Sequence, residues 1–268
     1  MNTEHLLYLS PGAGMMIVAL IAAVLWRRIS GVQWRWFWAG AGLWAIAVAL
    51  KIVSAVLANE AVIGFIKEHM PFALQVVLGG LYVGFQSSLF EMGFTLLAVL
   101  IWQSLGQSAP RAIAIGVGAG AFEAFALGFG SLVSVVLFLA GVPGTEKIGE
   151  SLATTAASMP LFWLAAPFER VIAILCHAST RALILLGIAK RRGLLALYGY
   201  VLFMLLDGVA GAAYVADWVQ PGLMWWIELA VLPFGIVSIP ILRWCWNRWP
   251  ETKDVPPIEP QENTPQTP

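Results

Sequence analysis

The sequence predicts an all-α membrane protein, a polytopic bundle of about seven transmembrane helices. Three observations predict this fold class. Of the 268 residues, 60% are hydrophobic and only 11% are charged, whereas about 25% are charged in a typical soluble protein. The mean hydropathy is +0.82. Several apolar runs also exceed the roughly 20 residues that cross a bilayer as a helix. With 15 basic and 15 acidic residues the net charge is zero, which gives no indication of a nucleic-acid partner.

The expected membrane spans follow one another with short connections. In chain order they lie at 12–26, 36–57, 72–104, 111–141, 160–189, 193–216 and 222–246. The third, fourth and fifth spans are long for one crossing, which a tilt or a kink accommodates. A run of glycines in the third span, at 79, 80 and 84, allows such a kink.

The segments outside these spans are few. Residues 59–70 are consistent with a short interfacial helix. Residues 247–268 are rich in Pro, Glu, Gln and Thr, and we expect them to form a disordered cytoplasmic tail because they offer no apolar face to bury. The expected organisation is therefore a single transmembrane domain, 1–246, followed by this tail.

The distribution of basic residues predicts the orientation. Seven spans place nearly all Lys and Arg residues of the loops on one side, whereas splitting the third span into two would scatter them. Cytoplasmic loops carry an excess of Lys and Arg. We therefore expect an integral plasma-membrane protein (the inner membrane in a bacterium) with its N-terminus outside and its C-terminus in the cytoplasm. The basic residues on the cytoplasmic side are Arg27, Arg28, Arg35, Arg111, Lys190, Arg191, Arg192, Arg243, Arg248 and Lys253.

Four ionisable residues lie at a similar depth in four different spans. Counted from the basic ends at ~1.5 Å per helical residue, each lies ~18–22 Å into the membrane. Ionisable groups at this depth are costly, so each is a functional candidate. Facing one another, they can share protons, bind a cation or activate a water; the alternative is a set of interhelical hydrogen bonds that holds the bundle together. The four residues are Glu91, Glu123, His177 and Asp207.

The fifth span carries further charged residues near its histidine. Arg170, His177 and Arg181 are spaced by seven and four residues, which places them on one helical face. Arg181, one turn from His177, can orient a carboxylate or bind a carbonyl. For Glu169, beside Arg170, a salt bridge near the outer surface and a role in a site both remain open.

Three other features carry weaker expectations. Lys51 is alone in the second span and can either snorkel or pair. Glu228 lies near the outer end of the seventh span, where we expect it to be solvated. Glycines surround Glu123 in the fourth span, which favours close helix packing, with room beside Glu123 as the alternative.

Three segments resemble the YhfC family of intramembrane metallopeptidases, which is related to the CAAX-protease and bacteriocin-processing superfamily. They read GVGAGAFE at 116–123, FERVIAILCHAS at 168–179 and LLD at 205–207, and the resemblance covers about 85–210. It implies a multi-helix membrane fold with a buried polar site that cleaves a peptide bond in or near the bilayer.

The resemblance also implies roles for residues and ligands. Glu91, Glu123, His177 and Asp207 would be the catalytic residues, with Glu169 and Arg170 supporting them. A divalent metal, Zn or Mn, would be held by His177, Glu123 and Asp207, where an oxygen-rich ligand set suits Mn or Mg better than Zn. The partners would be a peptide or membrane-protein substrate and the lipid bilayer.

Two alternatives compete with a peptidase. The first is a non-catalytic membrane protein of the same fold that binds or chaperones membrane segments. It is favoured by Phe94 and Thr95, where the superfamily commonly carries Arg, and by Phe203, where it usually carries His. The second is a small transporter that uses the same acidic groups, which ranks lower because the sequence has no evident inverted repeat. A retinal protein is excluded since residues 222–246 contain no lysine.

Overall fold

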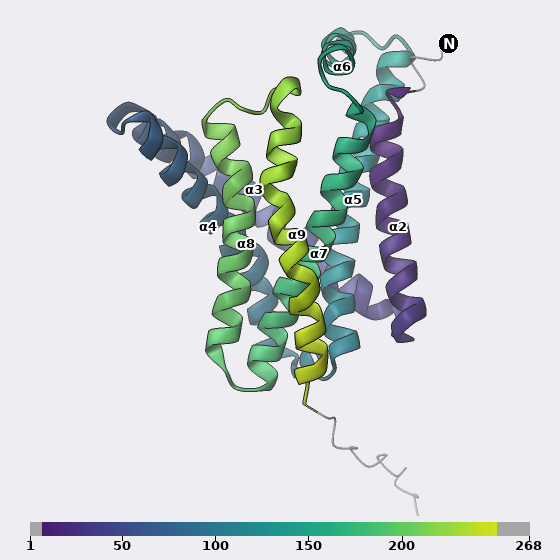
Figure 1. Ribbon diagram of the computed structural model, residues 1–268, viewed down its shortest axis with the longest axis vertical. Coiled ribbons are helices and arrows are strands. Elements are labelled where there is room, and N and C mark those ends of the chain that lie inside the picture. Colours follow the sequence, from purple (N-terminus) through teal and green to yellow (C-terminus); the bar gives the residue numbers. More distant parts are fainter. Residues whose placement is uncertain (1–6, 251–268) are drawn as a thin grey trace, which may run out of the picture.

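The computed structural model describes residues 7–250. It is a bundle of long helices with one short helix, α6, at one end (Figure 1), and this described part contains no strand. The predicted all-α fold is therefore confirmed. Seven of the helices are long and apolar enough to cross a membrane. The helices are α2 (Ser10–Ser30), α3 (Trp34–His69), α4 (Phe72–Ile101), α5 (Ala109–Leu139), α6 (Glu146–Ser158), α7 (Phe162–Ala189), α8 (Gly193–Val215) and α9 (Met224–Arg248).

The ends of the helices follow local backbone chemistry. Gly31, in the left-handed conformation at φ 68°, caps the end of α2. Met70 is extended, as expected for a residue that precedes a proline, and this ends α3 before Pro71. Pro110 lies in the first turn of α5, where the missing N–H costs nothing. These connections leave little chain outside the spans.

Two expectations about segment boundaries are corrected. Residues 59–69 do not form a separate interfacial helix but continue α3 to His69. No proline interrupts this stretch before Pro71, so the helix has no cause to end earlier. The last helix, α9, reaches Arg248, two residues beyond the expected end of the seventh span. Most of the expected cytoplasmic tail, residues 251–268, lies outside the described residues.

The third span is one continuous helix, α4, and its glycines serve helix packing. A Cβ placed on Gly84 would lie 2.0 Å from the carbonyl oxygen of Met204 on α8. Only glycine permits backbones to approach this closely. As a result, α4 and α8 lie against each other along their length, and their facing residues are brought together.

Helix α7 occupies the centre of the bundle. In its most apolar stretch of 18 residues, 83% of the residues are buried inside the protein. It packs against α2, α4, α5, α8 and α9. Glycines of α5 allow the closest approach: a Cβ on Gly116 would lie 2.5 Å from the Cα of Ala178, and one on Gly120 would lie 3.1 Å from the Cβ of His177. The expectation of close helix packing around Glu123 is confirmed, and this packing holds α5 against the histidine of α7.

The two ends of the bundle differ in charge. The end where α2 and α9 finish (the lower end in Figure 1) carries Arg27, Arg28 and Arg248 in the last turns of those helices. We call it the basic end. The opposite end carries α6 (the upper end in Figure 1) and is called the α6 end.

Candidate functional site

A cavity of about 420 Å³ with a partly polar wall lies inside the bundle, between α3, α4, α5, α7, α8 and α9. The charged residues expected in the membrane gather around it, and apolar side chains such as Phe203, Leu206 and Val231 complete the wall. The ionisable residues that line the cavity are Lys51, Glu91, Glu123, Glu169, Arg170, His177 and Asp207. The four residues that the sequence places at a similar depth, Glu91, Glu123, His177 and Asp207, therefore all line the same cavity.

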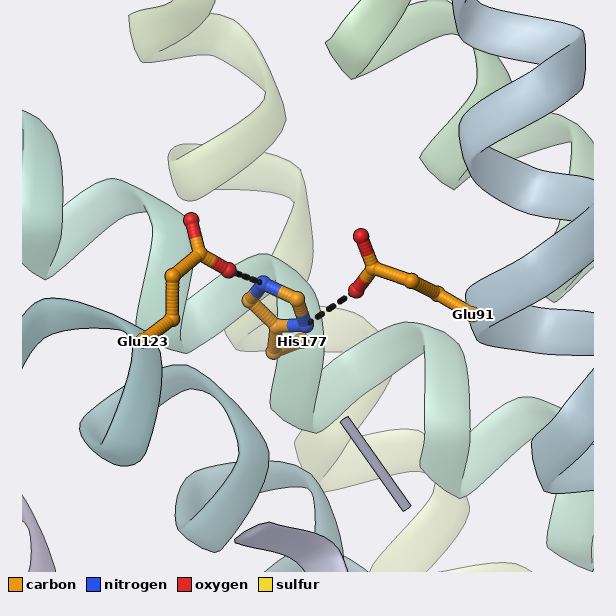
Figure 2. A group of neighbouring side chains, drawn as sticks. All are labelled: Glu91, Glu123 and His177. Atoms are coloured by element: carbon orange, nitrogen blue, oxygen red, sulfur yellow. Dashed lines mark hydrogen bonds and ion pairs between the residues drawn. The ribbon is translucent and has the colours of Figure 1, made fainter. Parts of the chain in front are cut away.

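His177 lies between two carboxylates. Its Nε2 atom is 2.8 Å from Oε2 of Glu123, and its Nδ1 atom is 3.8 Å from Oε2 of Glu91. Figure 2 shows that the two carboxylates approach opposite edges of the imidazole ring. One ligand atom from each of the three residues falls within 4.8 Å of the others.

Arg181 determines which ring nitrogen of His177 carries the proton. Its guanidinium donates a hydrogen bond to Nδ1 of His177, and its Nη2 lies 3.4 Å from Oε2 of Glu91. Because a guanidinium only donates, Nδ1 must accept, and the ring proton of a neutral His177 is on Nε2. Nε2 then donates to Glu123. Arg181 thus contacts a carboxylate, one of the two roles expected for it, and also the imidazole.

Glu123 receives two further donors. Nη1 of Arg170 lies 2.5 Å from Oε1 of Glu123, and the indole nitrogen of Trp44 lies 2.9 Å from Oε2. Arg170 also forms an ion pair with Glu169, the preceding residue on α7. For Glu169 the structure combines both alternatives, because its salt bridge with Arg170 lies at the wall of the cavity.

Glu91 and Asp207 are linked through α4. Nζ of Lys51 lies 2.8 Å from Oε1 of Glu91 and 3.0 Å from Oγ of Ser87. The Ser87 hydroxyl also forms a hydrogen bond with Asp207 on α8. Asp207 therefore joins the group through Ser87, since within the described chain no direct bond connects it to His177. The close packing of α4 on α8 brings these two carboxylates to the same side of the cavity.

The charges of the site nearly balance. Lys51, Arg170 and Arg181 supply three positive charges among the carboxylates, and each contacts at least one of them. A charge buried without a partner costs several kcal/mol, so such groups must be paired to persist in a membrane interior. The pairing also fixes the positions of the side chains around the cavity.

Sequence reasoning missed Ser87 and Trp44, left Lys51 open between two alternatives and placed Glu228 wrongly. Ser87 and Trp44 are not ionisable, so a search for charges inside spans passes over them; a mid-span Trp away from the interfaces was the available signal. Lys51 pairs with Glu91, one of its two predicted alternatives. Glu228 was expected to be solvated, and this was wrong: its exposed fraction is 3%, because α9 turns it toward the other helices near the α6 end.

Phe203 packs directly on the site histidine. Its ring lies 5.0 Å from that of His177, centroid to centroid, and the guanidinium of Arg181 lies 5.9 Å from the Phe203 ring centre. The side chain is almost fully buried. The position is therefore the right one for a second imidazole, but an apolar ring occupies it.

The donor set is chemically suited to a divalent cation. Glu91, Glu123 and His177 offer carboxylate oxygens and one imidazole nitrogen within 4.8 Å of one another. Oxygen-rich sets with a single imidazole suit Mn²⁺ or Mg²⁺ better than Zn²⁺. Glu91 belongs to this close group, in the place where the sequence analysis expected Asp207.

The fold and the site define a class of protein: an integral membrane protein of seven spans with a Glu–His–Glu group buried between its helices. Comparison with known families agrees. The model of the YhfC intramembrane metalloprotease family matches residues 14–231, so the chain belongs to the YhfC family. The match runs from α2 into α9 and includes every predicted site residue. No curated protein and no solved structure matches the chain.

Proposed function

We propose that this protein is an intramembrane metallopeptidase that cleaves a peptide bond in or near the bilayer. The observation that carries the proposal is the Glu91–His177–Glu123 group, which faces a cavity large enough for a short peptide segment and water. Membership of the YhfC family supports the same activity. The substrate would be a peptide or a membrane protein that reaches the cavity.

Each predicted site residue takes a role in this proposal. Glu91, Glu123 and His177 would hold the divalent cation, which requires the proton on Nε2 of His177 to move to Nδ1 and the Arg181 hydrogen bond at Nδ1 to be released. When bound, such a cation polarises a peptide carbonyl and activates water for attack.

Asp207 is the best placed general base. Glu91 and Glu123 each contact cations, whereas within residues 7–250 Asp207 has only the Ser87 hydroxyl as a direct hydrogen-bond partner. Its remaining lone pairs are therefore open to a water in the cavity. Asp207 would take the proton of the attacking water on its carboxylate and return it to the leaving nitrogen.

The cations and Trp44 hold the other groups in position. Arg170 and the Trp44 indole fix Glu123, while Arg181 fixes both His177 and Glu91. Groups that are oriented before the reaction need no reorganisation during it, which is the main source of electrostatic catalysis. Arg170, Glu169 and Arg181 are thus positioning residues.

We further infer that the basic end faces the cytoplasm. Its arginines are those that the positive-inside rule assigns to cytoplasmic loops. The N-terminus would then lie outside, and the α6 end would face the outer side of a plasma membrane. Cysteine accessibility at single introduced sites in α6 and after α9 would test this orientation.

Bound metal and peptide cleavage test the proposal together. The wild-type protein in detergent should carry about one Zn, Mn or Co per chain, and His177→Ala and Glu123→Ala should each lose it. A library of quenched fluorescent membrane peptides should be cleaved by the wild type, and Asp207→Asn should lower the rate by about 10²–10⁴. Glu150→Gln, an exposed acid of α6, is the matched control and should behave as wild type. Background metal in all proteins would refute the metal-dependent mechanism.

The internal charge balance and Phe203 favour a second candidate, a non-catalytic protein that binds membrane segments. In that case the buried ion pairs would serve the stability of the bundle, and Phe203 would mark a lost ligand position. The same experiment separates the two: this candidate binds peptides, cleaves none of them, and carries only background metal.

A further inference from the structure

A second chamber lies between the catalytic cavity and the α6 end. It has a volume of about 540 Å³ and is lined by residues of α2, α5, α6, α7, α8 and α9. Its wall includes polar residues from several elements, among them Ser131, Ser151, Thr155 and Gln220. A chamber with such a wall holds water and polar parts of a ligand more readily than a lipid-facing groove does.

The chamber adjoins the catalytic cavity. Glu169, Ala210 and Val231 line both spaces. The two spaces are therefore neighbours within the bundle, and a peptide with one part at the Glu91–His177–Glu123 group would have a neighbouring part near the chamber.

Glu228 presents an unused hydrogen-bond acceptor to the chamber. Its exposed fraction is 3%, and it lines the wall. Among the described residues no donor lies within hydrogen-bond distance of its Oε2 atom. A buried carboxylate oxygen without a partner is costly, and its presence in a native fold points to a ligand that completes it.

The charges of the chamber indicate the chemistry of that ligand. The described lining residues include two acids, Glu169 and Glu228, and no lysine or arginine. Glu169 is already paired with Arg170. Among the described lining residues Glu228 therefore has no cation beside it, and an ammonium or guanidinium group that entered the chamber would stabilise its ionised form.

We propose that this chamber is a specificity subsite that receives a basic side chain of the peptide substrate, with Glu228 as its recognition residue. The inference rests on the proposed peptidase function and names a feature of its substrate: a lysine or arginine close in sequence to the scissile bond. Helix α6 lies at this end of the bundle (Figure 1) and contributes Ser151, Leu152 and Thr155 to the wall, so the basic side chain would lie beside it.

Peptide binding tests the subsite without requiring cleavage. The full chain in lipid nanodiscs, carrying Asp207→Asn so that peptides stay intact, is titrated into fluorescein-labelled apolar decapeptides. Each peptide has a single lysine, norleucine or glutamate, moved along the sequence. At one position we expect lysine to bind about thirtyfold or more tightly than norleucine, the lower end of the range measured when one partner of a buried charge pair is removed.

Substitutions of Glu228 test whether this residue causes the preference for lysine peptides. Glu228→Gln should abolish the preference for lysine, whereas Glu228→Asp should retain it in part. Glu150→Gln, which removes an exposed acid at the same end, should leave it unchanged. Equal binding of lysine and norleucine peptides by the chain with intact Glu228 would overturn the inference, and so would a preference that survives in Glu228→Gln.

The experiments distinguish a failure of the proposed subsite from a failure of the proposed peptidase activity. If the wild type cleaves no peptide but binds lysine peptides through Glu228, the subsite stands and the peptidase activity does not. If the wild type cleaves peptides without regard to lysine, the activity stands and the subsite does not. If the Glu228→Gln variant fails to fold, the subsite is tested by two other measurements. These are the binding of lysine and norleucine peptides by the chain with intact Glu228, and the same binding by Glu228→Asp.

Discussion

Replacing Arg181 with methionine should destabilise the protein through the site rather than through packing. The Arg181 side chain is fully buried, and it supplies a donor to Nδ1 of His177 and to Oε2 of Glu91. Methionine fills much of the same volume but donates nothing. Removing one partner of a buried ion pair costs about 3–5 kcal/mol. Because Lys51 still contacts Glu91, we expect the lower part of that range, about 3 kcal/mol.

The two free cysteines provide the assay. Cys176 and Cys245 are both buried, so a fluorogenic maleimide reacts with them only after the bundle opens. Heating the detergent-solubilised protein with this reagent gives a half-reaction temperature. Arg181→Met should lower it by about 6–12 °C, using the roughly 2–4 °C per kcal/mol typical of chains near this length.

A double-mutant cycle tests the cause. If the cost comes from the uncompensated Glu91 carboxylate, Arg181→Met combined with Glu91→Gln should cost at least about 1 kcal/mol less than the sum of the two single changes. Cys245→Ser in the same backgrounds checks that the signal reports global opening. Additive effects of the two changes would refute the reasoning, because they would mean that the arginine and the glutamate do not stabilise each other.

Three further predictions concern the surroundings of the site. Gly84→Val should prevent the close packing of α4 on α8, where even a Cβ would lie 2.0 Å from a backbone oxygen, and abolish accumulation of folded protein in membranes. Ser87→Ala should reduce peptide cleavage about tenfold or more while leaving the maleimide half-reaction temperature within a few degrees, because it frees Asp207 without creating an unpaired cation. Phe203→His should raise Zn²⁺ affinity in equilibrium dialysis by about tenfold or more, since a second imidazole would lie beside His177; unchanged affinity would contradict the placement of the metal at this group.

Much of the site was predictable because helix geometry converts sequence spacing into depth. Glu91, Glu123, His177 and Asp207 each lie a similar number of residues from a basic loop, and a rise of ~1.5 Å per residue places them at one level. Spacing on α7 likewise predicts that Arg181 contacts His177. These inferences need only one helix at a time.

Other features depend on how helices are rotated and paired, which spacing does not specify. Lys51 selects Glu91 only because α3 turns it toward α4. Glu228 lies in the first turns of α9, where depth alone suggests water, but the chamber beneath α6 encloses it. Residues 59–69 extend α3 because nothing local ends the helix before Pro71. Contacts between distant segments decide each of these cases.

The pairing of the buried charges has a consequence for how the chain enters the membrane during synthesis. Helix α7 alone carries two arginines into the bilayer, and a charged side chain at a helix centre disfavours translocon insertion by about 2.5–3.5 kcal/mol. Their counter-ions Glu91 and Glu123 belong to α4 and α5, which leave the ribosome earlier. The order of the helices along the chain thus means that both counter-ions of these arginines are synthesised before α7, so α7 can enter the membrane beside carboxylates that neutralise its charges.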